Sequence, residues 1–362
     1  MTVSGGVTPD PNAGLVLTIG GRKVTPIYDT VRIEDAGDAA RGTLDAEVSG
    51  NLADYPEMYD QALVTVHDWH AGAPMFMGFL TMRSQRRGAD GTRIVLQATH
   101  IGNLIDDIWI PIENRPAETI QQRYGYFWGK YHGLYLSPDM SNVILANVTL
   151  AKQQFVNHTL RQLIDHCAVQ YSTSTVSFID NVGRPNFGAL VGNAEGRAPV
   201  LTLAAAPYNI NVDAPGAGEI SPQDFEVTYD GSAYANTVRV NGATASGSMN
   251  VIDKAAVAAA NGLVRWAVVD GASCKTQAQA LTYANSWLAK SKAAAVRGSF
   301  RTTKDTGWQA GQSMTVTDAA SGLAASVVYI ARVNRRVLLG GAHPEIEYTI
   351  EFGRSRPWLR SD

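Results

Sequence analysis

The chain has 362 residues, of which 45% are hydrophobic and only 17% are charged, and its formal net charge is −3. This length suggests about two to four domains with real hydrophobic cores, and the net charge shows no basic footprint that would argue for nucleic-acid binding. The charged fraction lies below the roughly 25% of ordinary domains. Low charge is typical of a protein that buries much of its outside in an assembly, although an Ala-rich compositional bias gives the same figure.

The sequence shows no targeting signal and no membrane span. Its first residues, MTVSGGVTPDPNAG, have no positive region followed by an apolar one, so they do not form a signal peptide. No run reaches the roughly 18 apolar residues that a transmembrane helix needs. The two cysteines, Cys167 and Cys274, are too few for a disulfide framework and lie in no CxxC motif. We therefore expect synthesis in the cytoplasm and no integral membrane span.

A flexible arm and a β domain open the chain. Residues 1–14 are rich in Gly, Pro, Ser and Asn, a composition typical of a disordered segment. Residues 15–102 form the β domain, and Gly20-Gly21 between two apolar runs predicts a hairpin turn in it. Its alternating patterns predict strands at Leu15–Ile19, Lys23–Tyr28, Thr30–Glu34, Ala46–Ser49, Gln61–His67, Met75–Arg83 and Thr92–Thr99.

The last three of these strands are echoed near the end of the chain. Aligning Gln61 with Gln312 sets Leu63 against Met314 and Thr65 against Val316. Strands and turns follow in the same order in both places, which predicts two copies of one β-barrel-like unit with other material between them. The strands of the second copy are expected at Ser313–Asp318, Ser326–Arg332 and Glu345–Phe352.

Residues 103–222 differ in character and predict a middle α+β domain. Apolar residues at i, i+3, i+4 and i+7 predict a helix over His158–Tyr171 with one face on a sheet. Strands at Thr175–Ile179 and Val200–Leu203 are expected to supply that sheet. The apolar residues at helical spacing are Leu160, Leu163, Ile164 and Cys167, so the Cys167 thiol is expected to be packed and reduced.

An aromatic stretch in the middle domain is the one candidate binding surface. Such a stretch can be a hot spot for a protein partner or a platform that stacks on sugars. It can equally be a loop that packs on its own domain, and the sequence leaves these alternatives open. Glycines separate its aromatic residues, which are Tyr124, Tyr126, Phe127, Trp128, Tyr131 and Tyr135.

The last domain spans residues 223–353 and carries an inserted helical and strand segment at about 243–295; residues 354–362 form a tail. Asn241-Gly242 predicts a hairpin turn. A helix is predicted over Thr276–Lys292, because Thr276 and Gln279 fit a capping box. Its buried stripe is expected at Leu281, Ala284 and Leu288, and further strands are expected at Phe225–Tyr229, Leu263–Val269 and Val296–Thr302.

The sequence holds no pattern for catalysis, a cofactor or a metal ion. A zinc-binding helix needs His at i and i+4 with a Glu between them, and two adjacent Asp on a turn point apart. No G-x-S-x-G and no phosphate loop occurs. The residues that invite such a role are His67, Asp68, His70, Asp106, Asp107, His158, Asp165 and His166. We predict a protein that is not an enzyme.

Motifs of the last third stand in a characteristic order: Phe225-x-Val-x-Tyr229, Ala235-Asn236-Thr-Val-Arg-Val-Asn-Gly242, Val269-Asp270, Thr276-Gln-Ala-Gln-Ala280, Gly298, Gly311-Gln312-x-Met-x-Val316 and Tyr329–Val333. Together they resemble the hub proteins at the tip of phage tails, the tail-associated or baseplate-hub family, which shows an N-x-V-x-V-x-G strand. The first domain is similar more loosely, through Val64-x-Val66, the F-x-G strand Phe76-Met-Gly78-Phe-Leu80 and Arg93–Ala98. The resemblance covers most of the chain and is weakest over residues 103–222.

The resemblance implies a structural protein with two related tube-type barrels per chain that assembles as a homotrimer. Three chains then present six barrels in a ring, which adapts a sixfold tail tube to a threefold tip and forms the channel for DNA ejection. The implied partners are the chain itself, the distal tail or tail-tube protein, the tape measure protein and tip fibre or receptor-binding proteins, with DNA only in transit. The implied place is the tail tip or baseplate of the virion, after synthesis in the host cytoplasm.

Two further expectations complete this interpretation. Many members of the family extend into a fibre, needle, lysozyme or peptidase domain, whereas this sequence stops at Asp362, so we expect a bare hub. The alternative hypothesis is a tail-tip protein that binds or degrades host cell-wall glycan through the middle domain. The lack of a convincing acid/base pair argues against its enzymatic form.

Overall fold

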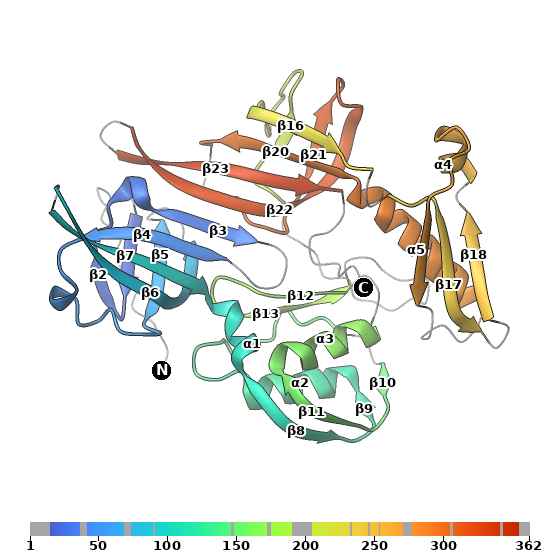
Figure 1. Cartoon of the computed structure of the whole chain (residues 1–362), viewed down its shortest axis with the longest axis horizontal. Coiled ribbons are helices and arrows are strands. Elements are labelled where there is room, and N and C mark those ends of the chain that lie inside the picture. The colour runs from blue at the N-terminus through green and yellow to red at the C-terminus, as the bar shows by residue number, and fades with distance from the viewer. Residues whose placement is uncertain are drawn as a thin grey trace.

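The chain is elongated and mostly β, with two barrels, a middle domain and a smaller inserted unit at the end far from the first barrel (Figure 1). This confirms the predicted α+β, mostly β, multidomain class. None of the described helices is long and apolar enough to cross a membrane. The computed structural model describes residues 15–36, 42–68, 74–89, 91–145, 148–171, 175–189, 205–231, 234–244, 247–252, 254–270, 277–304, 307–340 and 343–354.

The first barrel is a closed ring of antiparallel strands in the order β4-β7-β6-β5-β1-β2. A bridge between Pro26 and Val48 joins the segment after β2 back to β4. Alternation fixes the inward face, because β4 buries every second residue. The elements are β1 (Leu15–Ile19), β2 (Arg22–Val24), η1 (Tyr28–Thr30), β3 (Arg32–Ala36), β4 (Thr43–Ser49), η2 (Leu52–Asp54), β5 (Leu63–Asp68), β6 (Phe76–Gly88) and β7 (Gly91–His100).

The predicted hairpin at Gly20-Gly21 is confirmed. Both glycines have positive φ, 56° and 88°, the left-handed region that the two central residues of a tight hairpin turn adopt. A Cβ on Gly20 would lie only 2.7 Å from the carbonyl oxygen of Glu57. Glycine is therefore required here twice over, by its backbone conformation and by this close approach.

The second barrel has its strands in the order β16-β20-β23-β22-β21-β14-β15. β14 and β15 belong to this sheet although both precede residue 223. Its core is rich in aromatic rings, among them Phe300, Trp308 and Phe352. The strands are β14 (Asn209–Asn211), β15 (Glu219–Ile220), β16 (Gln223–Tyr229), β20 (Val296–Thr302), β21 (Ser313–Asp318), β22 (Leu323–Gly340) and β23 (His343–Gly353).

The strand order confirms the predicted duplication. The strands β3-β4-β7-β6-β5 of the first barrel match β16-β20-β23-β22-β21 of the second in chain order, in neighbour order and in antiparallel pairing. Each copy has a register shift at the same place, after Leu80 in β6 and after Ile330 in β22. The flanking strands differ, since β14 runs parallel to β21 whereas β1 runs antiparallel to β5.

The alignment predicted between the two copies is wrong by one residue. The N–H of Gln61 donates to the carbonyl of Leu80, and the N–H of Gly311, not of Gln312, donates to the carbonyl of Ile330. Positions 61 and 311 are therefore equivalent, and positions in β5 and β6 match those 250 residues later in β21 and β22.

Burial supports the corrected alignment. Val64 and its true equivalent Met314 are both buried, whereas Leu63, aligned with Met314 from the sequence, is only partly buried. A slip of one residue turns every side chain of a strand to the other face. The sequence did not reveal the slip because both glutamines precede an alternating run.

The middle domain combines helices with short antiparallel ribbons, β8 with β11, β9 with β10 and β12 with β13. Helix α3 confirms the predicted helix, starts two residues later than predicted and buries Cys167. The expected strand at Val200–Leu203 lies outside the described residues. The elements are η3 (Ile101–Asn103), α1 (Leu104–Asp107), β8 (Trp109–Arg115), β9 (Glu118–Thr119), α2 (Ile120–Tyr131), β10 (Thr149–Leu150), β11 (Gln153–Thr159), α3 (Leu160–Tyr171), β12 (Thr175–Ile179) and β13 (Pro185–Ala189).

The inserted unit lies between β16 and β20 and packs one helix on a sheet of order β18-β17-β19. The predicted turn at Asn241-Gly242 is wrong, because β17 runs through both residues. The buried stripe of α5 runs through Ala280, Ala284 and Leu288; Leu281, one position further around the helix, is 42% exposed against expectation. Thr276 and Cys274 lie outside the described residues. The elements are β17 (Thr237–Thr244), β18 (Gly247–Ile252), α4 (Lys254–Ala259), β19 (Trp266–Asp270) and α5 (Gln277–Ala294).

In both copies the strand that carries the register shift runs further than predicted. β6 continues to Gly88 and β22 to Gly340, beyond the predicted ends at Arg83 and Arg332. We call residues 82–88 of β6 with 91–97 of β7 the first arm. Residues 332–340 of β22 with 343–351 of β23 are the second arm.

Candidate functional site

The two barrels are joined edge to edge by the second arm. Residues 332–336 of β22 pair antiparallel with residues 36–32 of β3, and β22 and β23 reach over β3 (Figure 1). A single hydrogen-bonded sheet of 14 strands therefore runs through both barrels. We call the contact between β22 and β3 the internal joint.

A buried arginine fixes the internal joint. Arg335 is 4% exposed, and its Nη2 donates to the carbonyl of Trp308 at 2.6 Å and lies 3.6 Å from Oδ2 of Asp35. The same carboxylate oxygen accepts the N–H of Ala310 at 3.1 Å. Asp35 of the first barrel is thus held at two points by the second barrel, and a buried guanidinium depends on such partners.

Apolar contacts reinforce the internal joint. Val337 of the second arm is 3% exposed and is part of the core of the first barrel. Ile346, on the other strand of the arm, packs against the cores of both barrels. At the surface, Arg332 forms an ion pair with Glu34 at 3.1 Å. The joint is therefore built like a core as well as like a sheet.

The aromatic stretch of the middle domain is helical from Tyr124 to Tyr131, within α2, and only Tyr135 lies beyond the helix. Thr119 caps it: its Oγ1 accepts the N–H of Gln122 at 3.2 Å, and Oε1 of Gln122 accepts the N–H of Thr119 at 2.9 Å. This reciprocal pair is a capping box, and the Thr-x-x-Gln signal for it is present in the sequence. The glycines at 125 and 129 lie inside the helix.

Burial divides the six aromatic side chains into two groups, five of them on α2 and the sixth, Tyr135, beyond its end. Tyr124, Phe127 and Trp128 are 1%, 0% and 0% exposed and pack in the core of the middle domain, so the predicted partner surface is wrong for these three. Tyr135 is 53% exposed, and its ring meets Phe79 edge-on. A partner surface stays a proposal for the other three, Tyr126, Tyr131 and Tyr135.

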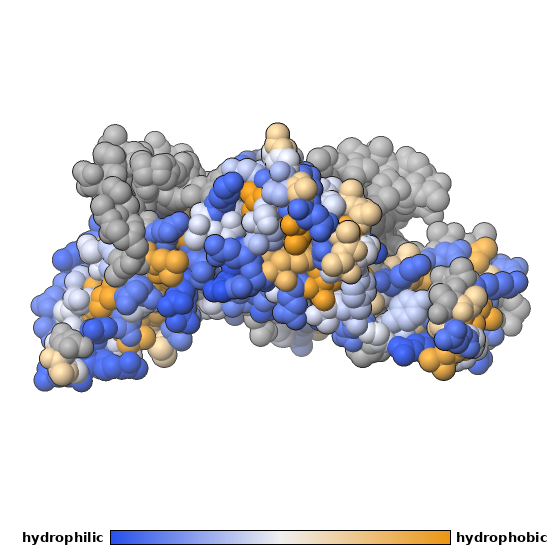
Figure 2. Space-filling model, turned by 90° about the horizontal axis from the view of Figure 1, so that it is seen from above, coloured by the Kyte–Doolittle hydropathy of each residue, from blue (hydrophilic) through white to orange (hydrophobic). Residues whose placement is uncertain are grey.

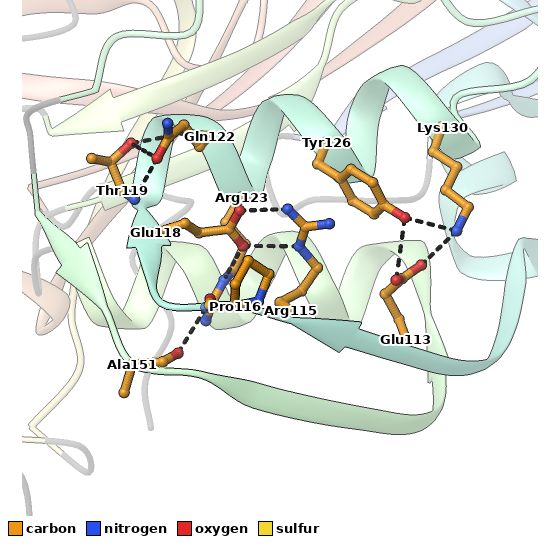
Figure 3. Close-up of polar contacts among 10 residues, drawn as sticks. All are labelled: Glu113, Arg115, Pro116, Glu118, Thr119, Gln122, Arg123, Tyr126, Lys130 and Ala151. Atoms are coloured by element: carbon orange, nitrogen blue, oxygen red, sulfur yellow. Dashed lines mark hydrogen bonds and ion pairs between the residues drawn. The ribbon is translucent and has the colours of Figure 1, made fainter.

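Polar groups along α2 and β8 converge on Glu113 (Figure 3). Lys130 Nζ lies 2.7 Å from Oε2 of Glu113, Tyr126 donates its hydroxyl to Oε1 at 3.2 Å, and Tyr131 donates to Oε2. Burial alone would raise the pKa of Glu113, but the hydrogen bonds from Lys130, Tyr131 and Tyr126 outweigh it and lower the pKa.

A second carboxylate, Glu118, sits between two guanidinium groups. Arg123 is fully buried and donates to Glu118 at 3.0 Å and to the carbonyls of Pro116 and Ala151 at 2.9 and 2.7 Å. Arg115 forms a two-point contact with the same carboxylate. Burial would raise the pKa of Glu118, but these hydrogen bonds and charges lower it.

This arrangement is structural in character. A general acid needs a carboxyl group whose pKa is raised, whereas both glutamates are held ionised. The histidines near this site pack as aromatic rings, since His158 and His166 meet Phe155 edge-on. Asp106 is paired with Arg161 at 2.6 Å. Among the described residues no three His, Cys, Asp or Glu side chains are grouped as a metal would need.

Two strand faces expose large apolar side chains. On the β8–β11 ribbon, Ile112 and Val156 stand opposite each other and are 55% and 49% exposed. On the inserted unit, Trp266 and Val268 of β19 are 55% and 63% exposed. Figure 2 shows that hydrophobic residues also gather in the middle of the upper face, over the second barrel.

No protein-family profile and no curated protein matches the chain. Solved structures do match it. A tail protein from Neisseria meningitidis MC58 is similar with 13% identity and a TM-score of 0.69, over 96% of this chain and 98% of that one. The 43 kDa tail protein of prophage MuSo2 from Shewanella oneidensis is similar with 15% identity and a TM-score of 0.65, over 95% and 98%.

A third similar structure is a component of the E. coli type VI secretion system, itself described as similar to the T4 bacteriophage tail proteins gp27 and gp5. It shares 12% identity and a TM-score of 0.52, over 95% of this chain and 79% of that one. At such identities the likeness is one of fold. The chain has the fold of phage-type tail proteins along nearly its whole length, as the sequence motifs predicted.

Proposed function

We propose that this chain is the structural hub of a phage-type tail tip. The observation that carries the proposal is the duplicated barrel joined through the internal joint, in a chain that shares the fold of tail proteins over about its full length. An edge-to-edge joint between two like units is a head-to-tail contact, and head-to-tail contacts build rings when the rotation closes.

In this proposal three chains form the ring. Two barrels per chain give six barrels around the axis, so a threefold assembly presents a sixfold surface to a tail-tube protein. The ring closes the end of the tube, anchors the tape measure protein and tip fibres or receptor-binding proteins, and lets DNA pass through its lumen during ejection. The protein is then a component of the virion, made in the host cytoplasm.

The proposed role is mechanical and not enzymatic. It uses strand edges and barrel surfaces, and both glutamates of the middle domain are neutralised by cations as in a scaffold. The alternative is binding of host cell-wall glycan by the middle domain. The exposed ring of Tyr135 is the observation that keeps it open, because sugars stack on exposed aromatic faces.

The molar mass in solution tests the ring. A trimer has three times the 38.8 kDa of one chain, that is 116.4 kDa, and we expect this mass from light scattering on a sizing column. A stable dimer contradicts the proposal, because twofold symmetry cannot place six barrels in a ring. Antibody labelling of particles in the electron microscope should mark one end of the tail, and a label along the tube would contradict the tip position.

Glycan binding is tested with a matched pair of variants. Tyr135→Ala removes the exposed ring, and Tyr59→Ala removes a ring that is 55% exposed on the first barrel. If the alternative holds, the wild type and Tyr59→Ala sediment with purified cell walls and Tyr135→Ala does not. The hub proposal expects no sedimentation of any of the three.

A further inference from the structure

Each barrel copy has two strand edges that can pair with another barrel: its arm, and the outer edge of its first strand, β3 or β16. The internal joint uses one arm and one first strand. It uses the arm of the second copy and the β3 edge of the first copy. Their equivalents are the first arm and the outer edge of β16. Within the described residues β6 pairs only with β5 and β7, and β16 pairs only with β20. The chain therefore has two strand edges, on the first arm and on β16, that are unpaired among the described residues although their equivalents pair with each other in the internal joint.

We propose that the first arm of one chain pairs with β16 of a second copy, repeating the internal joint between chains. The inference rests on the proposed ring and adds to it the two strands and their register. An unpaired strand edge is a ready template for another chain. The pairing of β22 with β3 inside the chain shows that an arm and a first strand of these barrels fit together.

The duplication fixes the register of this contact. Positions in β6 lie 250 residues before their equivalents in β22. Arg32 of β3 pairs with Asp45, and Glu226 of β16 pairs with Ser299. Asp45 and Ser299 are equivalent, so Arg32 corresponds to Glu226. In the internal joint Arg336 stands opposite Arg32. Between chains Arg86 then stands opposite Glu226. By the same step Ser84 stands opposite Thr228.

The charges of the two edges are complementary. The first arm carries Arg83, Arg86 and Arg87 on β6, of which Arg83 already pairs with Asp60 of its own chain. On β16, Asp224 already pairs with Arg301, so Glu226 is the carboxylate that faces the arm. Where the internal joint sets two arginines opposite each other, the contact between chains sets an arginine opposite a glutamate. Opposite charges on facing strands stabilise a pair and like charges destabilise it. Arm-to-arm and β16-to-β16 contacts are thus disfavoured, which selects the head-to-tail contact of a ring.

The two arms differ in the polarity of their side chains, as expected for one arm that is covered by a barrel and one that faces water. Val333 and Val337 of the second arm are buried, whereas Arg83 and Arg87 hold the equivalent positions in the first arm. The second arm is covered as the chain folds, but the first arm stays in water until assembly. Charged residues on an edge strand keep it soluble and prevent indiscriminate pairing. The first arm therefore has the composition of an edge that waits for a specific partner.

The loops beneath the two arms are also alike. Arg335 of the second arm donates to the carbonyl of Trp308, and its equivalent Gln85 accepts the N–H of Leu52 at 3.0 Å. In each copy, then, the side chain at this position forms a hydrogen bond with a loop of its own barrel. In the internal joint the backbone of β22 pairs with β3 while Arg335 keeps this bond, so the bond of Gln85 does not prevent the backbone of β6 from pairing in the same way. Glu226 and Thr228 of β16 are exposed, as are Ser84 and Arg86.

Disulfide trapping in the full chain tests the register. The N–H of Val337 donates to the carbonyl of Val31 in the internal joint, so the next pair along, Arg336 with Arg32, is a non-hydrogen-bonded pair. The Arg86–Glu226 pair inherits that geometry, in which Cα atoms lie about 4.5 Å apart, within disulfide range. Under mild oxidation Arg86→Cys/Glu226→Cys should give a covalent trimer band, and Ser84→Cys/Thr228→Cys should do the same.

The matched control moves one cysteine by one residue. Gln85→Cys/Glu226→Cys places the thiols on opposite faces of the sheet and should remain uncross-linked, as should each single-cysteine variant. A closed ring stops at three chains, whereas an open series of contacts gives a ladder. Cross-linking of the shifted pair as readily as the matched pair overturns the register.

The mass and the cross-link separate this inference from the proposed function. A 116.4 kDa particle, three times 38.8 kDa, without the matched cross-link leaves the ring standing and overturns the joint. A monomer that yields the matched cross-link supports the joint and contradicts a stable ring. A monomer without it overturns both.

A charge exchange checks the same contact without cysteine. Arg86→Glu or Glu226→Arg should weaken trimer formation at least about tenfold, and the double exchange should restore most of the loss. Lys152→Glu reverses an exposed charge on the middle domain and should leave assembly unchanged. If either single exchange assembles like the wild type at low salt, where such pairs are strongest, the proposed joint is wrong.

Discussion

At the scale of single residues, Arg123 is a buried cation that ties separate segments of the middle domain together. It is fully buried and holds Glu118 and two backbone carbonyls. Arg123→Met keeps the length of the aliphatic stem but removes the guanidinium and with it all three hydrogen bonds. Because Arg115 still pairs with Glu118, we expect a loss of about 3 kcal/mol, at the low end for a broken buried pair. Hydrogen exchange of α2 measures it.

The control for this substitution is an exposed ion pair. Arg22 contacts Glu57 at 3.2 Å, with side chains 47% and 30% exposed. Arg22→Met should cost less than about 1 kcal/mol in the exchange of β2 and its neighbours. Equal losses in the two variants would mean that burial of Arg123 does not strengthen its contacts.

Glu113 makes the stability of the middle domain depend on pH. Its pKa is lowered in the folded state, so its contribution is fully present above the unfolded pKa of about 4.3 and is lost as the pH falls through the folded pKa. In thermal unfolding from pH 7 to pH 3, Glu113→Gln should start less stable than the wild type and then lose less on acidification. Parallel curves for the two proteins would contradict this role.

At the scale of elements, the glycines of α2 are a test of why the helix forms. Gly129 is exposed, has ordinary helical backbone and has no atom within 4 Å of an added Cβ. Gly129→Ala should therefore stabilise the helix by about 0.5–1 kcal/mol. Gly133, just past the helix, has φ of +73°, so Gly133→Ala should destabilise it by about 1 kcal/mol. Hydrogen exchange of α2 should move in opposite directions in the two variants.

The same helix shows what the sequence could and could not predict. Strands with a core-facing alternation were found, and β20 has the predicted bounds, Val296–Thr302. Helix α2 was missed because glycines between aromatic rings suggest a loop, although the capping residues Thr119 and Gln122 were readable. Packing of Phe127 and Trp128 in the core outweighs the low helix propensity of glycine.

The arms were missed for a different reason. Beyond the register shift the two strands behave differently. The end of β6 leaves its own core and is exposed along nearly its whole length, whereas the end of β22 still alternates but packs against two cores, with Val333 in that of its own barrel and Val337 in that of the first. The arginine-rich end of β6 therefore resembles a turn in the sequence, and the end of β22 places Val337 in the core of the other barrel. The joint between barrels is a long-range contact, and no local pattern encodes it. The same holds for Arg335 and Asp35, which are 300 residues apart in the chain.

At the scale of the whole molecule, the internal joint decides whether the two barrels act as one body. Val337→Asp places a carboxylate in the core of the first barrel, where burial of an unpaired charge is costly. The least expensive response is for the second arm to lift off β3. We expect amide exchange of β3 to rise at least about tenfold while β16 and β20, on the far side of the second barrel, stay protected.

The same strand offers the control for this substitution. Val327→Asp makes an identical change at a side chain that is 53% exposed, so exchange of β3 should stay at its wild-type value. If Val337→Asp exposes both barrels throughout, the two copies fold as one unit. If it exposes β3 alone, the copies are separate bodies held by a joint. Only in that case can the strand pairing that joins them within a chain be repeated between chains without refolding either barrel.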